Sequence, residues 1–256
     1  MIRTWLAYPL TRGLDIDDPK TTHLRRQIIQ EKNFLRRIYQ EWYQAIVASL
    51  PGGQGAVLEL GAGGGFMSDF VPDLITSELF YCPTVRAVLN ASHLPFAGQS
   101  LRAIVMTNVL HHLAEPRLFF AEATRCVGPD GVVVMVEPWV TPWSRFVYTH
   151  LHHEPFQPEA PLWELGNGRP LSTANDALPW IVFRRDRHKF EREFPNWRIE
   201  LIKPIMPFRY LLSGGVSLRS LAPAWSFGLW KQLENALGPW SNQLAMFAQI
   251  LLRRWD

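Results

Sequence analysis

The stretch that decides the fold runs Ala56-Val57-Leu58-Glu59-Leu60-Gly61-Ala62-Gly63-Gly64-Gly65. Its first five residues predict a short, mostly apolar strand that leads directly into a glycine-rich turn. Glycine has no Cβ and tolerates unusual backbone dihedral angles, so such a turn lets the backbone approach a ligand closely. Where the turn opens a helix, N–H groups at the helix start favour polar or anionic ligand groups. The turn by itself is equally compatible with an ordinary strand-to-helix connection.

The spacing of the glycines separates two kinds of cofactor site. Dinucleotide sites use the pattern G-x-G-x-x-G, in which the third glycine lets the helix pack closely on the strand. Here the pattern is G-x-G-x-G, and Phe66 occupies the place of the third glycine. The turn therefore departs from the fingerprint of nicotinamide-dependent oxidoreductases, which stay the less favoured alternative.

An alternation of strands and helices follows the turn, although Pro72 leaves room for only a short helix directly after it. Strands are expected at residues 74–77, 85–89, 101–107 and 132–136. A helix is expected to begin at Glu115-Pro116, because proline is favoured in a first turn. Gly128-Pro129-Asp130-Gly131 predicts a turn before the last of these strands. Strands separated by helices imply a parallel α/β sheet.

The flanks of this core show different patterns. Leu35, Ile38, Trp42 and Ile46 recur at spacings of three and four, which predicts one helix from about residue 21 to residue 50. Residues 139–195 are rich in Trp, Pro, His and Arg and carry weak helix signals, so we expect an insertion packed over the sheet. The segments expected beyond it are a strand, a helix and a last strand, at residues 197–202, 227–237 and 244–252.

Two acidic residues bear on the ligand of the glycine turn. Glu59 lies inside the first strand, where a buried carboxylate needs hydrogen bonds or a cationic ligand group. Glu78 follows the second strand, and an acidic side chain there can accept hydrogen bonds from ribose hydroxyls. Both features favour a ligand that carries a ribose and a positive charge.

Four segments with regular gaps extend this pattern: Leu58 to Gly65, Glu78, Asn90-Ala91-Ser92-His93-Leu94-Pro95-Phe96 and Asn108-Val109-Leu110-His111-His112-Leu113. Together they resemble the ordered motifs of class I methyltransferases that use S-adenosylmethionine (SAM). The resemblance is closest to the broad type-11 group, which includes ubiquinone and menaquinone methyltransferases, and it covers about residues 55–138. It implies a Rossmann-like α/β fold, with a mostly parallel seven-stranded sheet flanked by helices, an N-terminal helical cap and an insertion after the fifth strand.

The same resemblance implies one methyltransferase domain over the whole chain. Its parts are a helical cap, a SAM-binding core, a substrate-side insertion and a C-terminal part of strands and a helix, at residues 1–53, 54–138, 139–195 and 196–256. The residues that would hold SAM are Glu59, Gly61, Ala62 and Gly63 at the methionine, Glu78 at the ribose, Asn90, Ala91 and Leu94 at the adenine, and Asn108 near the methyl group. The family often has Asp where this chain has Asn90, whose amide oxygen can still accept from the adenine amino group.

Histidines and a carboxylate are the candidates for proton transfer from an acceptor hydroxyl, because their pKa values suit that task. His111 follows the fourth strand at the edge where such sheets bind ligands. His153 and Glu154 lie beyond the fifth strand, in a cluster with His150 and His152. We select His153, Glu154 and His111 as catalytic candidates. No fixed spacing to a third ligand supports a metal site, so none is predicted.

Composition narrows the partners. The formal net charge is +3, and Lys/Arg residues recur as doublets such as Arg25-Arg26 rather than as long blocks. Such doublets are more typical of solvated helix faces than of nucleic-acid binding. We therefore expect no nucleic-acid partner. Two cysteines cannot build a disulfide framework, so we expect a cytoplasmic protein. The 11 tryptophans leave peripheral membrane contact open.

We therefore expect SAM-dependent methyl transfer to a small-molecule acceptor, with oxygen as the favoured acceptor atom. Hydrophobic, lipid-linked and sugar-linked metabolites all stay open as acceptors. The alternative from another class is a methyltransferase-like partner protein without activity. The oligomeric state is not predicted.

Overall fold

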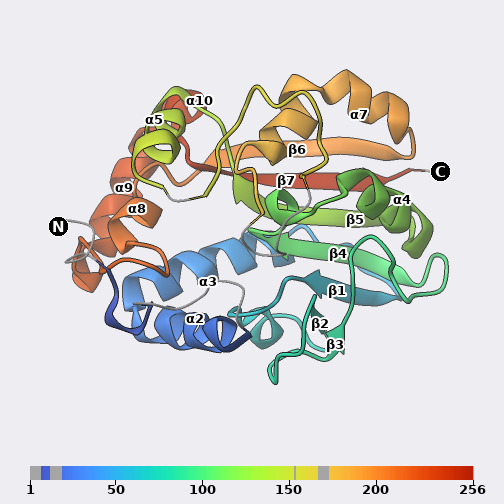
Figure 1. Cartoon of the computed structure of the whole chain (residues 1–256), viewed down its shortest axis with the longest axis horizontal. Coiled ribbons are helices and arrows are strands. Elements are labelled where there is room, and N and C mark those ends of the chain that lie inside the picture. The colour runs from blue at the N-terminus through green and yellow to red at the C-terminus, as the bar shows by residue number, and fades with distance from the viewer. Residues whose placement is uncertain (1–6, 12–18, 153, 167–172, 256) are drawn as a thin grey trace.

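In a computed structural model of the chain, which describes residues 7–11, 19–152, 154–166 and 173–255, seven strands form one sheet (Figure 1). The strands are β1 (Ala56–Leu60), β2 (Ile75–Glu78), β3 (Ala87–Val88), β4 (Leu101–Thr107), β5 (Val127–Pro138), β6 (Trp197–Ile205) and β7 (Phe247–Arg254). Their order in the sheet is β3-β2-β1-β4-β5-β7-β6. Strands β1 to β5 pair in parallel, and β7 pairs antiparallel with both β5 and β6. The predicted mostly parallel seven-stranded sheet is confirmed.

Alternate residues of the central strands face opposite layers of helices, as the period of two in a strand requires. Val57, Val105 and Val134 point into one apolar core, and their neighbours Leu58 and Ile104 point into the other. All five side chains are buried. Because both faces are covered, the strands are nearly continuous apolar runs rather than alternating ones.

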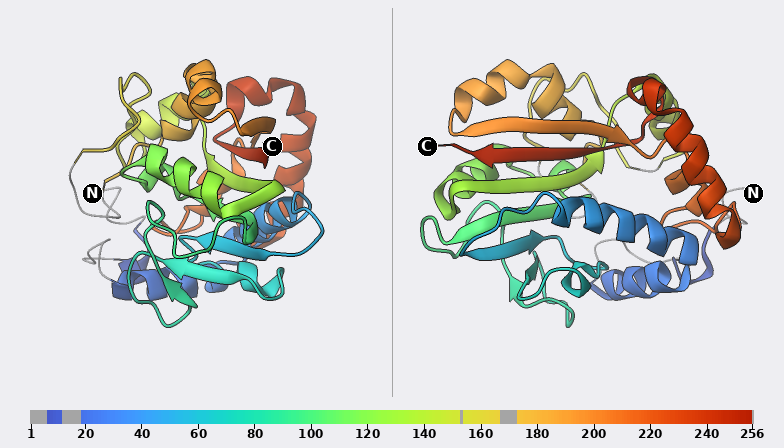
Figure 2. Two further views of the ribbon diagram at one scale, coloured as in Figure 1. Left: turned by 90° about the vertical axis from the view of Figure 1, so that its right-hand side faces the viewer. Right: turned by 180° about the vertical axis from the view of Figure 1, so that it is seen from behind.

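Helices of both layers enclose the sheet (Figure 2). Those that contribute to the first core are α2 (Pro19–Glu31), α3 (Asn33–Val47), α5 (Pro142–His150), α8 (Arg209–Ser213) and α9 (Phe227–Ala236). Those that contribute to the second core are α4 (Pro116–Cys126), α6 (Leu178–Trp180), the π-helical turn η4 (Ile181–Arg185) and α7 (Arg187–Glu193). The remaining helices are short, namely α10 (Ser241–Leu244) and the 3₁₀ turns η1 (Pro9–Thr11), η2 (Met67–Asp69), η3 (Leu110–His112), η5 (Ala224–Ser226) and η6 (Gly238–Trp240). Of these, η2 adds Met67 to the first core and η3 adds Leu110 to the second.

The single helix expected from residue 21 to residue 50 is wrong, because the chain breaks between α2 and α3. Lys32 leaves helical geometry with φ −85° and ψ 85°. Its side chain is buried, and its ammonium donates to the carbonyl of Leu218 at 2.7 Å. This tertiary contact overrides the helical periodicity and lets α2 lie at an angle to α3 (Figure 1).

The connections on the β3 side of the sheet hold little helix. After the glycine turn the described chain forms only the three-residue turn η2, so the expected short helix is reduced to a single 3₁₀ turn. Parallel strands are usually connected by a full helix, so the connections in this half of the sheet provide less helical cover than usual. The helix α3 supplies the missing cover, since its side chains pack with Phe66, Met67 and Leu74 in the first core.

Three other sequence expectations need correction. The expected Gly128–Gly131 turn lies within the long strand β5, where Asp130 has a positive φ of 59° and the pairing with β4 shifts register. The insertion holds regular helices despite its weak signals, and α5 begins with a reciprocal capping box between Thr141 and Ser144. The last strand begins at Phe247 rather than at residue 244, because α10 occupies the preceding positions.

Candidate functional site

The glycine turn is locked in place by its own backbone and by its neighbours. The N–H of Ala62 donates to the carbonyl of Ser77 at 2.9 Å, which ties the turn to β2. Gly61 has a positive φ of 63°, and a Cβ on it would stand 2.4 Å from the side chain of Val109. Only glycine fits such a conformation and such a close approach without strain.

Glu78 reaches back over the turn rather than away from it. A Cβ on Gly63, whose φ is +21°, would lie 2.6 Å from Oε1 of Glu78. The carboxylate also accepts a hydrogen bond from the N–H of Leu79 at 3.1 Å. The predicted methionine-side and ribose-side residues are therefore in direct contact in the fold.

The helix α2 covers the glycine turn. A Cβ on Gly64 would stand 3.0 Å from the backbone nitrogen of Arg26, and one on Gly63 would stand 3.0 Å from the side chain of Thr22. The guanidinium of Arg26 donates to the carbonyl of Gly65. The expectation of a solvated face is wrong for the Arg25-Arg26 doublet, because both side chains are half-buried at this turn.

Two carboxylates share this corner of the molecule. Burial, reinforced by the nearby charge of Glu78, raises the pKa of Glu59 to about 8, while Arg26 opposes the rise. Burial also raises the pKa of Glu78, against the N–H groups of Leu79 and Gly63 and the charge of Arg25. The two arginines therefore do not fully offset the burial of the two carboxylates, and a cationic ligand would stabilise their ionised forms.

Asn108 ends β4 in a conformation that few residues adopt. Its φ is +58°, in the left-handed region where asparagine is enriched. Its N–H donates to the carbonyl of Val136 at 2.9 Å. On α3, burial raises the pKa of Tyr39 to about 12, against the charge of Arg25 and the polar side chain of Asn108.

The residues assigned to the adenine lie in the connection from β3 to β4. Asn90 is exposed, and its Oδ1 accepts from the N–H of Ser92 at 2.9 Å in a local turn. Ala91 and Leu94 are buried in the second core, where the N–H of Leu94 donates to Glu122 at 2.7 Å. The structure places these three residues on one connection, and their role at the adenine stays a prediction.

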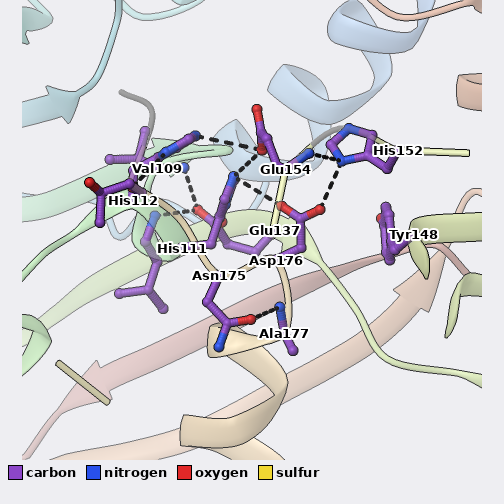
Figure 3. Close-up of polar contacts among 12 residues, drawn as sticks. Val109, His111, His112, Glu137, Tyr148, His152, Glu154, Asn175, Asp176 and Ala177 are labelled. Atoms are coloured by element: carbon purple, nitrogen blue, oxygen red, sulfur yellow. Dashed lines mark hydrogen bonds and ion pairs between the residues drawn. The ribbon is translucent and has the colours of Figure 1, made fainter. Parts of the chain in front are cut away.

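A second polar centre lies at the carboxyl ends of β4 and β5 (Figure 3). Glu137 is fully buried at the end of β5 and accepts hydrogen bonds from the N–H groups of Val109 and Leu110, both at 2.8 Å. Its other oxygen lies 2.7 Å from Nδ1 of His111. These three bonds fix the orientation of the His111 ring and aim Nε2 away from the sheet.

The insertion carries two carboxylates to that ring. Nε2 of His111 lies 3.6 Å from Glu154 Oε2 and 3.7 Å from Asp176 Oδ1. Glu154 Oε2 also lies 4.0 Å from Nε2 of His112, and Asp176 Oδ2 lies 3.0 Å from Nδ1 of His152. We call His111, His112, Glu137, His152, Glu154 and Asp176 the histidine–carboxylate cluster. It joins two of the three predicted catalytic residues, while His153 lies outside the described residues.

Backbone hydrogen bonds explain why segments so far apart meet here. The N–H of Asn175 donates to the carbonyl of His111 at 2.9 Å, and the N–H of Asp176 donates to the carbonyl of Pro155 at 3.0 Å. The side chain of Asn175 pairs with both backbone groups of Gln157, at 2.9 and 3.1 Å. Asn175 therefore holds two segments of the insertion, around residues 155–157 and 175–176, against the turn that follows β4.

The electrostatics of the cluster differ from one imidazole to the next. Burial opposes the charge on His111, but Glu137, Glu154 and Asp176 together raise its pKa well above the usual value. Burial and the charge on His111 lower the pKa of His112 to about 3. Burial opposes the charge on Glu154, yet the imidazoles, His111 foremost, hold its pKa well below the usual value. The pKa values of these two neighbouring rings, whose centroids are 4.2 Å apart, are therefore shifted in opposite directions.

Comparison with known proteins bears on the family and the fold. Residues 58–135 match the protein family described as methyltransferase domain. Among solved structures, a candidate methyltransferase from Haloferax volcanii in complex with a methyltransferase activator is 11% identical, with a TM-score of 0.51 and coverage of 90% of this chain and 97% of that one. The fold is that of a class I methyltransferase.

Two further solved structures are similar to this chain with slightly lower TM-scores. The geranyl diphosphate C-methyltransferase from Streptomyces coelicolor is 14% identical, with a TM-score of 0.48 over 93% of this chain and 86% of that one. The SAM-dependent methyltransferase from Mesorhizobium loti is also 14% identical, with a TM-score of 0.47 over 82% and 96% of the two chains. No curated protein matches the sequence. Of the helices in the described ranges, none has the length and apolar character needed to cross a membrane.

Four kinds of site residue were not predicted from the sequence: Glu137, Asp176, His152 and the arginines of α2. Glu137 could have been found, because a charged residue directly after the apolar run of residues 132–136 marks the ligand-binding edge of a parallel sheet. Asp176 gives no such signal, since it lies in an irregular part of the insertion. His112 was not selected as a site residue either, although its ring faces Glu154.

Proposed function

We propose that the chain is a SAM-dependent methyltransferase that methylates an oxygen atom of a small molecule. The observation that carries the proposal is the position of two different polar centres at one edge of the sheet. The glycine turn with Glu59 and Glu78 lies at the ends of β1 and β2, and the histidine–carboxylate cluster lies at the ends of β4 and β5. In open α/β sheets this edge is where ligands bind.

The residues around the glycine turn fit SAM. Glu59 and Glu78 are acidic groups with raised pKa values, and SAM brings an ammonium and a sulfonium that would stabilise their ionised forms. Gly61 and Gly63 have no side chain at positions where a Cβ would clash with Val109 or Glu78. Glu59, Gly61, Ala62 and Gly63 would hold the methionine part, Glu78 the ribose, and Asn108 the region near the methyl group. Arg25 and Arg26 add cationic side chains suited to a carboxylate.

The cluster fits the acceptor side of the reaction. Bound SAM supplies an electrophilic methyl group on a sulfonium, so the protein has mainly to align an acceptor and dispose of its proton. When SAM is bound, the acceptor oxygen would take its methyl group, and the carboxylate of Glu154 would accept the hydroxyl proton. His111 and Glu154 are the residues that would contact the hydroxyl, and Glu137 positions His111.

One observation favours the alternative of a methyltransferase-like partner protein without activity. The helix α2 packs directly on the glycine turn through Thr22 and Arg26, so α2 has to move away from the turn for SAM to bind. A nicotinamide-dependent oxidoreductase loses support, because the turn opens onto the three-residue η2 and not onto an α-helix whose N-terminus could hold a pyrophosphate.

Calorimetric titration of the purified protein with SAM, with NADH and NADPH as controls, tests the proposal. We expect saturable binding of SAM alone, followed by methyl transfer from labelled SAM to a hydroxylated acceptor in a small-molecule panel. A folded protein that binds no SAM would overturn the enzyme proposal. Saturable SAM binding without turnover on any acceptor, together with a stable protein partner, would support the alternative.

A further inference from the structure

The histidine–carboxylate cluster has the ligand types of a transition-metal site. Two imidazoles and a carboxylate, those of His111, His112 and Glu154, each offer one donor atom, and the three atoms lie within 4.8 Å of one another. Imidazole nitrogen with one carboxylate oxygen is a ligand set used by Zn²⁺ and Fe²⁺, with positions left open for other ligands. The three residues come from η3 and from the insertion, on the side of the cluster away from Glu137.

The outer partners of both rings are those that metal-bound histidines have. A ligating imidazole nearly always donates its second N–H to a carboxylate or a backbone carbonyl. Nδ1 of His111 lies 2.7 Å from Glu137, and Nδ1 of His112 lies 3.4 Å from the carbonyl of Thr173. Both Nε2 atoms therefore face Glu154, at 3.6 and 4.0 Å. These separations are longer than hydrogen bonds.

The separations suit an ion between the donor atoms. Ligands bound at about 2.0–2.1 Å in a tetrahedral site stand about 3.3 Å from one another. The Nε2-to-Oε2 distances of 3.6 and 4.0 Å exceed that value by less than an ångström, so small side-chain rotations would close the site.

Asp176 provides an independent sign of a cation site. It is 1% exposed, and within the described part of the chain neither of its oxygens accepts a hydrogen bond of standard geometry. It has the ion-pair contact with His152, and its Oδ1 lies 3.7 Å from the same Nε2 of His111. A buried carboxylate without full hydrogen bonding is costly unless a cation compensates it.

We infer that His111, His112 and Glu154 bind a divalent transition-metal ion, with Asp176 beside it as a further carboxylate. Its role at the acceptor side rests on the proposed methyl transfer. In place of direct contact with His111 and Glu154, the acceptor oxygen would meet the bound ion, which would lower the pKa of the hydroxyl as metal ions do for bound water. Ion binding itself depends only on the cluster.

The test uses tag-free, chelator-treated protein dialysed against Zn²⁺ or Co²⁺. We expect one ion per chain by elemental analysis, and a visible Co²⁺ absorption of ligand-field type. His112→Gln and Glu154→Gln should each lower the affinity for Zn²⁺ by at least about tenfold, the smaller end of losses at metal sites. His188→Gln, at a side chain that is 98% exposed outside the cluster, should bind Zn²⁺ as the unmodified chain does. Circular dichroism establishes that each variant is folded.

The outcomes separate this inference from the proposed function. Absence of a stoichiometric ion in the folded, unmodified chain overturns the metal site, as does undiminished binding in the double variant of His112→Gln and Glu154→Gln. If that chain still binds SAM, the proposed function stands without the ion. If the ion binds and SAM does not, the metal site stands and the proposed methyl transfer fails.

Discussion

The glycine-turn side and the cluster side of the site are built in different ways. On the first side, Glu59 and Glu78 belong to one continuous stretch that contains β1, the turn and β2, and their pKa values are raised. On the second side, the carboxylates come from β5 and two separate parts of the insertion, and each meets an imidazole. Local sequence thus places two carboxylates with raised pKa values beside the glycine turn, whereas long-range folding brings each carboxylate of the cluster to an imidazole.

Removing Glu137 should produce the largest effect, because the cluster side depends on it for packing as well as for charge. Glu137→Ala leaves the N–H groups of Val109 and Leu110 without their acceptor and leaves His111 without its partner. We expect the free energy of unfolding to fall by about 3–5 kcal/mol, as when one partner of a buried pair is lost. Urea denaturation measures this change.

Glu200 offers a matched control on the surface, where it pairs with Arg253 at 2.7 Å with both side chains about 30% exposed. Glu200→Ala should cost about 0–1 kcal/mol. A loss below about 1 kcal/mol in Glu137→Ala would contradict the view that the cluster side is held together by buried charge pairs.

A side chain at Gly63 should damage the glycine-turn side while sparing most of the fold. In Gly63→Val the new Cβ would lie 2.6 Å from Glu78 at a φ of +21°, which should cost about 1–3 kcal/mol of stability. Affinity for SAM should fall at least tenfold, or about 1.4 kcal/mol, because Glu78 is displaced from the turn. Calorimetry and denaturation measure the two effects separately.

Gly52 serves as the control for this substitution, since a Cβ added there would meet no atom within 4 Å and its φ lies outside the left-handed region. Gly52→Ala should change stability by no more than about 0.5 kcal/mol and leave SAM affinity unaltered. Equal SAM binding by Gly63→Val and the unmodified chain would show that the turn does not contact the cofactor.

The pH dependence of SAM binding should sharpen the contrast in charge. With its pKa near 8, Glu59 is mostly protonated at neutral pH in the unliganded protein, and a cationic ligand favours its ionised form. Binding should therefore release a proton below pH 8, and affinity should rise with pH up to that value by at most about tenfold per unit. Calorimetry in two buffers of different ionisation enthalpy counts the released protons.

Glu59→Gln should abolish this contribution and flatten the pH profile, because the amide does not titrate. The amine of SAM titrates equally in both proteins, so the difference between them isolates Glu59. Identical proton release in the variant would mean that Glu59 is already ionised or lies away from the cofactor.

Much of the fold was predictable because its signals are local. The apolar runs at residues 56–60, 101–107 and 132–136 each formed a strand where expected, since both faces of a parallel sheet are covered. The break at Lys32 was not predictable from periodicity, because a carbonyl group nearly 190 positions away along the chain binds its ammonium. The arginines of α2 gave no signal either, since only the packing of α2 on the turn buries them.

The sequence by itself determined the glycine turn, its acidic neighbours and the apolar strands of the parallel core, because hydrophobic period and glycine spacing act over a few residues. Only the tertiary structure decided that His111 meets Glu154 and Asp176. That meeting depends on Asn175, which hydrogen-bonds to His111 and to Gln157 at once. Such bonds join segments whose spacing along the chain carries no periodic signal, so they become visible only when the chain is folded.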